Sequence, residues 1–182
     1  MEKMQNALRN DCEMKGVSPL RQPFPYPPMQ VREKNQYYAD LLTVDYCGSV
    51  SEMTAIMQYL HGQNYLSCSQ CPKAAVILGI AMAEMIHLQK LGQMILLLGG
   101  RLDYSVRTCS GPMFWTPQYV NFAEREDEIL SVNIDGERAA INQYRKHMSM
   151  IGDDCVTALL ARIIQDEEYH IMLLQEMSSK EY

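Results

Sequence analysis

Two stretches of the sequence, EMTAIMQY at residues 52–59 and ERAAINQY at residues 137–144, fit one pattern, ExxAIxQY. A second pattern, ExxH, also occurs twice, at residues 84–87 and 167–170, and the apolar residues around the two copies match. Each ExxAIxQY stretch is followed by one ExxH stretch. The order indicates a duplicated helical hairpin.

The repeated acids lie on apolar helix faces. Residues three or four apart share one face of a helix, and at that spacing each acid has apolar neighbours and no Lys or Arg: Glu52, Glu84, Glu137 and Glu167. Buried carboxylates are costly unless they are paired, hydrogen-bonded or bound to a metal. Two divalent cations would balance four converging carboxylates. The alternative is a core that holds a few buried acids and satisfied histidines.

The ExxH spacing lets one helix present a carboxylate and an imidazole in the same direction. The sequence therefore predicts a centre of two metal ions with six ligands: Glu52, Glu84, His87, Glu137, Glu167 and His170. Four carboxylates and two imidazoles suit iron or manganese better than copper. Zinc is an alternative occupant in a purified sample.

The chain has helical patterning with few interruptions. We expect helices at about residues 33–66, with an irregularity at Gly48, and at 72–99, 132–151 and 154–178. A long connection, residues 101–130, joins the second helix to the third. This predicts an all-α, ferritin-like four-helix bundle with one long crossover between helices two and three. The connection could instead be a mobile lid or a partner-binding loop.

The N-terminal 30 residues differ from the rest. Five of the eight prolines fall within SPLRQPFPYPP at 18–28. Proline is not tolerated inside helices or in central strands. We expect residues 1–30 to form an extended arm, dispensable for folding and metal binding, and residues 31–182 to form the bundle domain.

Composition excludes several classes of protein. A net charge of −6 without a Lys/Arg cluster argues against nucleic-acid binding. The apolar stretch 74–100 contains Glu84, His87 and Lys90, which argues against a membrane span. The N-terminus lacks a signal-peptide core, so we expect a cytoplasmic protein whose six cysteines are free thiols and whose CxxC at Cys68 and Cys71 has no metal role.

The six ligands, their order and DEEYH at 166–170 resemble the ferritin-like superfamily, on the branch of bacterioferritins, rubrerythrins and manganese catalases with their spore-coat relatives. Rubrerythrins have a further acid where this chain has Ala140, so the ligand set is more similar to bacterioferritin and manganese catalase. Rubrerythrin-type electron supply is in doubt, which leaves the electron donor unknown. We do not expect haem at Met85.

The resemblance implies that the hydroxyls of Tyr59 and Tyr144 hydrogen-bond carboxylates of facing helices; plain core packing is the alternative. Asp166 could accept the second ring N–H of His87. His61 and His147 lack the ExxH context, and we expect them at the surface or at helix ends.

We expect two iron or manganese ions per chain and an oxidoreductase that removes hydrogen peroxide, as a catalase or a peroxidase. The alternatives are a ferroxidase that uses dioxygen and stores iron, as bacterioferritin does, and a structural spore-coat component. We expect a homodimer or a larger homo-oligomer.

Overall fold

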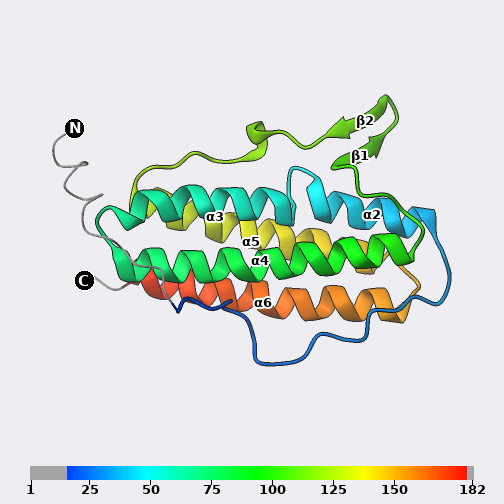
Figure 1. The fold of residues 1–182 in the computed structure, drawn as a ribbon, viewed down its shortest axis with the longest axis horizontal. Helices are drawn as coiled ribbons and strands as arrows, with labels where there is room; N and C mark the ends of the chain where they lie inside the picture. The colour runs from blue at the N-terminus through cyan, green and yellow to red at the C-terminus, as the bar shows by residue number, and fades with distance from the viewer. Residues whose placement is uncertain (1–15, 180–182) are drawn as a thin grey trace.

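The computed structural model describes residues 16–179, and they form the predicted bundle (Figure 1). The chain runs through α2 (Gln36–Cys47), α3 (Glu52–Ser67), α4 (Cys71–Leu97), β1 (Ser105–Thr108), β2 (Gly111–Phe114), a 3-10 turn (Pro117–Tyr119), α5 (Glu126–Met148) and α6 (Asp154–Ser179). α2 and α3 lie end to end along one edge of the bundle, and α4, α5 and α6 complete it. The predictions of an all-α bundle and of a long crossover are confirmed.

The single helix expected at 33–66 is two helices, because the chain leaves helical geometry at Gly48. A Cβ at Gly48 would lie 2.6 Å from the carbonyl oxygen of Val44, a contact that only glycine avoids. Ser51 then caps α3 by accepting a hydrogen bond from the Thr54 amide. The break places Glu52 in the first turn of α3, beside the middle of the bundle.

The connection between α4 and α5 contains a β-hairpin, which the helical patterning did not predict. β1 and β2 pair antiparallel, with Ser105 opposite Phe114. Trp115, just after β2, donates from its indole nitrogen to the Thr54 hydroxyl at 3.0 Å. The rest of the connection runs along α3 to the start of α5 (Figure 1).

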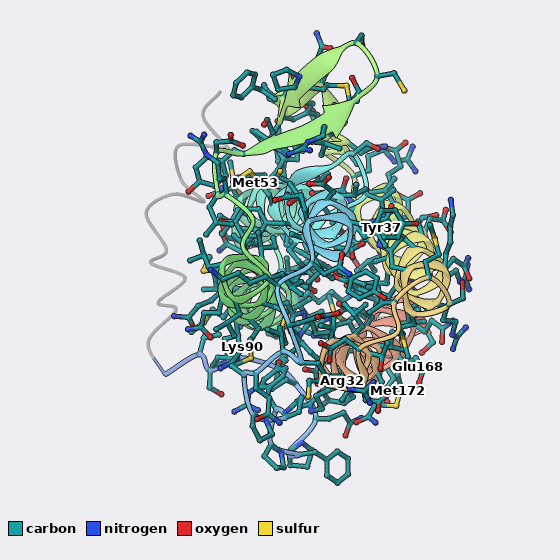
Figure 2. All side chains as sticks on the ribbon, turned by 90° about the vertical axis from the view of Figure 1, so that its right-hand side faces the viewer. Arg32, Tyr37, Met53, Lys90, Glu168 and Met172 are labelled. Carbon is teal, nitrogen blue, oxygen red and sulfur yellow. The ribbon has the colours of Figure 1, made fainter. Side chains whose placement is uncertain are left out.

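Two apolar clusters fill the bundle, one toward each end. One contains Leu42 and Leu91, and the other contains Ile77 and Leu174. The ligand candidates lie between these clusters along α4 and α6. Seen along the bundle, side chains fill the interior, whereas Lys90, Glu168 and Met172 lie on the outside (Figure 2).

α4 is long and apolar enough to cross a membrane, with a mean hydropathy of 1.5 over 18 residues. Half of that window is buried in the bundle, where α4 packs against α2, α3 and α6. These contacts are those of a central core helix.

Residues 16–35 form the extended segment that the prolines predict, but this arm packs along the bundle near α4 and α6 (Figure 1). The backbone amide of Leu20 donates to the Gly79 carbonyl at 2.9 Å. The expected separation of residues 1–30 from the bundle is wrong for residues 16–30, because extended backbone can still pair with side chains and helix carbonyls. That the arm is dispensable for folding and metal binding stays a prediction. Residues 1–15 lie outside the described part of the chain.

The cysteines differ in state. Cys47, Cys68, Cys109 and Cys155 are free thiols, as expected. Cys71 is disulfide-bonded, which contradicts the expectation for that residue. Cys12 lies outside the described residues.

Candidate metal centre

The fold brings the six predicted ligands together in the middle of the bundle. α3 and α5 each supply one Glu, and α4 and α6 each supply an ExxH pair. All six are nearly or fully buried, with exposed fractions of 0 to 4%: Glu52, Glu84, His87, Glu137, Glu167 and His170.

Within the described residues the ligand atoms form two overlapping groups, each within 4.8 Å. One group is Glu52, Glu84, His87 and Glu167, and the other is Glu84, Glu137, Glu167 and His170. Glu84 and Glu167 belong to both, whereas each histidine belongs to one. Two adjacent metal ions, if bound in these groups, would share Glu84 and Glu167 as ligands.

The hydrogen bond of His170 decides which ring nitrogen faces the carboxylates. Nε2 lies 2.8 Å from the carbonyl oxygen of Leu20, which only accepts, so Nε2 carries the hydrogen. Nδ1 lies 2.9 Å from Glu84 Oε1 and 3.0 Å from Glu167 Oε2. None of these three atoms has a hydrogen-bond partner of acceptable geometry in the described structure. In the neutral imidazole, a lone pair therefore points at two carboxylate oxygens.

His87 is turned the same way, but its Nδ1, unlike that of His170, is hydrogen-bonded to Glu84 Oε2. Its Nε2 donates to Asp166 Oδ2 at 3.0 Å, as predicted. Although burial raises the pKa of Asp166, hydrogen bonds from His87 and Arg162 lower it to about 2, so Asp166 is an ionised acceptor. The other nitrogen, Nδ1, lies 2.9 Å from Glu84 Oε2 and 3.3 Å from Glu167 Oε1.

The pKa shifts of the buried groups show the electrostatic cost of this crowding. Burial, together with the charges of Glu84 and Glu167, raises the pKa of Glu137 to about 8. Burial and the same neighbours raise the pKa of Glu52 well above its usual range. Burial lowers the pKa of both histidines, but the nearby carboxylates outweigh it and raise the pKa overall. Protons thus balance part of the carboxylate charge.

Both predicted tyrosines reach a ligand carboxylate on a facing helix. The Tyr59 hydroxyl of α3 donates to Glu137 of α5, and the Tyr144 hydroxyl of α5 donates to Glu52 of α3. Both rings are buried. The hydrogen bonds confirm the predicted contacts and show that these tyrosines are more than core packing.

A cavity of about 320 Å³ reaches the carboxylates from the side of α3 and α5. Its lining includes all four ligand acids and several neutral polar side chains, among them Gln58, Asn121 and Asn133. Gln58 donates to Asn133 at 3.0 Å and accepts from the Asn121 amide at 3.0 Å, which ties α5 and the crossover to α3. The cavity gives small molecules a route to the carboxylate side of the centre.

His147 lies at a helix end, as expected, whereas His61 lies in the middle of α3 and is only half-buried. His147 is at the end of α5 but is 5% exposed, with Nδ1 2.8 Å from Asp45 of α2. Gln143 also donates to Asp45, at 2.8 Å. Asp45 lies 98 positions from Gln143 and 102 from His147 in the sequence, so no local spacing predicts the contact. His61 is partly buried, and its ring lies 3.1 Å from the Ala123 carbonyl.

Comparison with known proteins indicates the same protein family as the site residues do. A family model for the ferritin-like domain matches residues 50–180, most of the chain. The chain belongs to the ferritin-like family. Among curated proteins, no sequence match is found.

Several solved structures of ferritin-like proteins share the fold. A manganese catalase from Anabaena superposes with a TM-score of 0.73 at 21% identity, covering 86% of this chain and 77% of that chain. For a bacterioferritin of Desulfovibrio desulfuricans the TM-score is 0.65 at 23% identity, with coverage of 79% and 78%. A dodecameric thioferritin from Bacteroides fragilis gives 0.62 at 20% identity, with coverage of 81% and 88%.

Proposed function

We propose that this ferritin-like protein holds two manganese or iron ions and uses them to convert hydrogen peroxide into water and oxygen. The observation that carries the proposal is the pair of histidine nitrogens aimed at carboxylate oxygens, with the opposite nitrogens engaged by Leu20 and Asp166. A cation between them would take these nitrogens and oxygens as ligands. Glu84 and Glu167 would bridge, while Glu52 with His87 and Glu137 with His170 would complete the two positions.

The donor set fits these metals. Oxygen and imidazole ligands suit manganese and iron, and carboxylates shared between two groups suit an adjacent pair. When bound, two such ions supply the exchange of two electrons that peroxide chemistry requires. The Anabaena structure of the same fold is a manganese catalase, which supports this choice of metal and reaction.

Disproportionation balances without an outside reductant. One peroxide gives up two electrons and two protons and leaves as oxygen, and a second takes up both and leaves as two waters. The chain must hold protons between these half-reactions. Glu52 and Glu137 line the cavity, and each accepts a tyrosine hydrogen bond that orients its carboxylate. A peroxidase cycle would need an external electron donor.

The burial of the ligand side chains favours metal ions that stay bound over ions that are stored and released. Glu84 and Glu167 are each 1% exposed, and both histidines have outer hydrogen-bonding partners. Ligands held in this way keep their orientation and bind metal more tightly. A peroxide-removing enzyme keeps its metals, whereas iron storage must pass them on.

A specific feature favours ferroxidase activity as the second candidate. Acids line the cavity, Asp135 in addition to the four ligand carboxylates, and no Lys or Arg is among its described lining residues. Such a lining attracts cations. The bacterioferritin with the same fold has a di-iron site, so Fe(II) entry by this route is the reaction to test beside peroxide removal.

Oxygen release and Fe(II) oxidation separate the two functions. Protein reconstituted with Mn(II) and given peroxide without reductant should release one oxygen per two peroxides, whereas metal-free protein should release none. With Fe(II) and oxygen, oxidation should stop after the ions that fill the centre. Continued oxidation of many Fe(II) per chain, with no oxygen from peroxide for either metal, would replace the catalase proposal with the ferroxidase.

We expect Tyr59→Phe and Tyr144→Phe to keep the metals but to lower the peroxide rate by about 10- to 100-fold, because each loses a hydrogen bond that orients a ligand carboxylate. The measurement is kcat at matched metal content. Tyr65→Phe is the control, because its hydroxyl bonds the exposed Glu124 away from the centre. Unchanged kinetics in both variants would reduce these tyrosines to core packing.

A further inference from the structure

The arm contacts the outer edge of both candidate histidine ligands. These contacts involve residues 20–26, which come from outside the four helices that carry the ligands. The cavity opens on the opposite side, toward α3 and α5. The centre thus has an open carboxylate side and a histidine side covered by the arm.

On the His170 side, the contact is backbone to ring. The Leu20 carbonyl accepts from His170 Nε2 at 2.8 Å, and the Leu20 amide donates to the Gly79 carbonyl at 2.9 Å. Gly79 is the close-approach position: a Cβ there would lie 2.7 Å from Leu20 Cγ and 3.1 Å from the Ser18 carbonyl oxygen. Because position 79 has no side chain, the Leu20 carbonyl can reach the His170 ring.

On the His87 side, the contact passes through Asp166. Its Oδ1 accepts from the Gln22 amide at 2.7 Å, and its Oδ2 accepts from the Tyr26 hydroxyl at 2.7 Å and from His87 Nε2 at 3.0 Å. Asp166 has no exposed surface. The arm therefore satisfies the carboxylate that orients His87.

Arg162 of α6 fastens this part of the arm. It is 5% exposed, and its Nη1 lies 2.7 Å from Asp166 Oδ1. Its Nη2 donates to the carbonyls of Gln22 and Phe24 at 2.8 and 2.9 Å. Its guanidinium also stacks over the Tyr26 ring at 4.6 Å, while that ring meets His87 edge-on at 6.2 Å. A buried arginine whose Nε and Nη2 donate to arm carbonyls indicates a specific docking site.

We propose that residues 20–26 form a positioning segment of the metal centre, which fixes both histidines with Nε2–H outward and Nδ1 toward the metal positions. The inference rests on the proposed function for its metal, but the hydrogen bonds belong to the chain itself. Outer partners of histidine ligands set ring orientation and ligand basicity, and losing one costs about 10- to 100-fold in metal affinity. Arm docking and metal binding should strengthen each other, because linkage is reciprocal.

Two variants of the full chain test the two contacts separately. Gly79→Ala pushes Leu20 off α4, and Tyr26→Phe removes one donor to Asp166 while keeping the ring over Arg162. Each has a matched control. In Gly62→Ala the new Cβ meets Ile129 at 2.7 Å, an equal clash away from the arm, and Tyr65→Phe removes a surface hydroxyl–carboxylate bond.

The first measurement needs no metal: NMR of ¹⁵N-histidine-labelled protein should show imidazole Nε2–H protons of His87 and His170 protected from exchange. Gly79→Ala should lose the His170 signal, and Tyr26→Phe should shift the His87 signal. The second measurement is Mn(II) affinity by competition with a chelator, where both variants should bind about 10- to 100-fold more weakly and both controls should match the wild type.

The outcomes separate this inference from the proposed function. Arm variants that bind Mn(II) as tightly as the wild type, or a wild type without protected imidazole protons, would overturn the positioning role. Protected protons that disappear only in the arm variants support it even if the wild type binds no metal, and that result would overturn the proposed function alone.

Discussion

Glu167→Gln should bind fewer than one metal ion per chain and lose at least about 100-fold in activity. Glu167 lies in both groups of ligand atoms, so its loss removes a ligand from both positions, and outer partners alone are worth about 10- to 100-fold. Gln keeps the volume, so packing between the two apolar clusters is preserved. Metal analysis after reconstitution and desalting gives the stoichiometry.

A graded series makes this result specific. Glu137→Gln leaves the His87 group complete, so it should retain about one metal ion per chain. Glu168→Gln is the neighbouring control, because Glu168 is an exposed residue paired with Arg145 at 2.9 Å (Figure 2). If Glu167→Gln kept both ions, the shared role assigned to this carboxylate would be wrong.

Metal loading should raise the melting temperature by about 8 to 16 °C for each filled site. A ligand at about 1,000 times its Kd stabilises the native state by about 4 kcal/mol, and each kcal/mol moves the midpoint by about 2 to 4 °C at this chain length. Calorimetry of metal-free and Mn(II)-loaded protein measures the difference. An excess of chelator should reverse it.

The stabilisation should also grow with pH. Because the pKa of Glu137 is raised to about 8, the folded metal-free protein holds a proton that the unfolded chain releases near the ordinary glutamate pKa of 4.5. This contribution to stability is therefore present below about pH 4.5 and is lost as pH rises to about 8. Glu52 acts in the same direction. Glu84, with a lowered pKa, loses its contribution only in acid.

In the loaded protein, metal replaces these protons, so the gap between loaded and metal-free midpoints should widen from pH 5 to pH 8. A metal-free protein whose melting temperature stayed level over this range, with no response to Mn(II), would contradict the electrostatic description of the centre.

The sequence predicted the parts of the fold that repeat locally. ExxAIxQY and ExxH each lie within a few turns of helix, so their helical phase alone placed the ligands on buried faces. The same phase places Tyr59 and Tyr144 two turns beyond Glu52 and Glu137, whereas their contacts with carboxylates were implied by the resemblance to the family. The repeated order of the two motifs predicted the bundle, and the length of residues 101–130 predicted the crossover.

The parts that the sequence did not predict depend on distant pairings. The contact of Tyr26 with Asp166 joins residues 140 positions apart, and the proline-rich composition that predicts an extended arm does not say where the arm lies. Proline removes amides but leaves carbonyls, and the arm uses carbonyls at Leu20, Gln22 and Phe24. Glycine at position 79 was a local sign of close approach within a helix.

The most direct test of the central claim is anomalous diffraction from crystals of Mn(II)-reconstituted protein. We expect two manganese peaks between Glu84 and Glu167, one bound to Nδ1 of His87 and Glu52, the other to Nδ1 of His170 and Glu137. Crystals from metal-loaded, active protein that showed no peak within this ligand set, or peaks only at other residues, would contradict the assignment of these six residues as a two-metal centre.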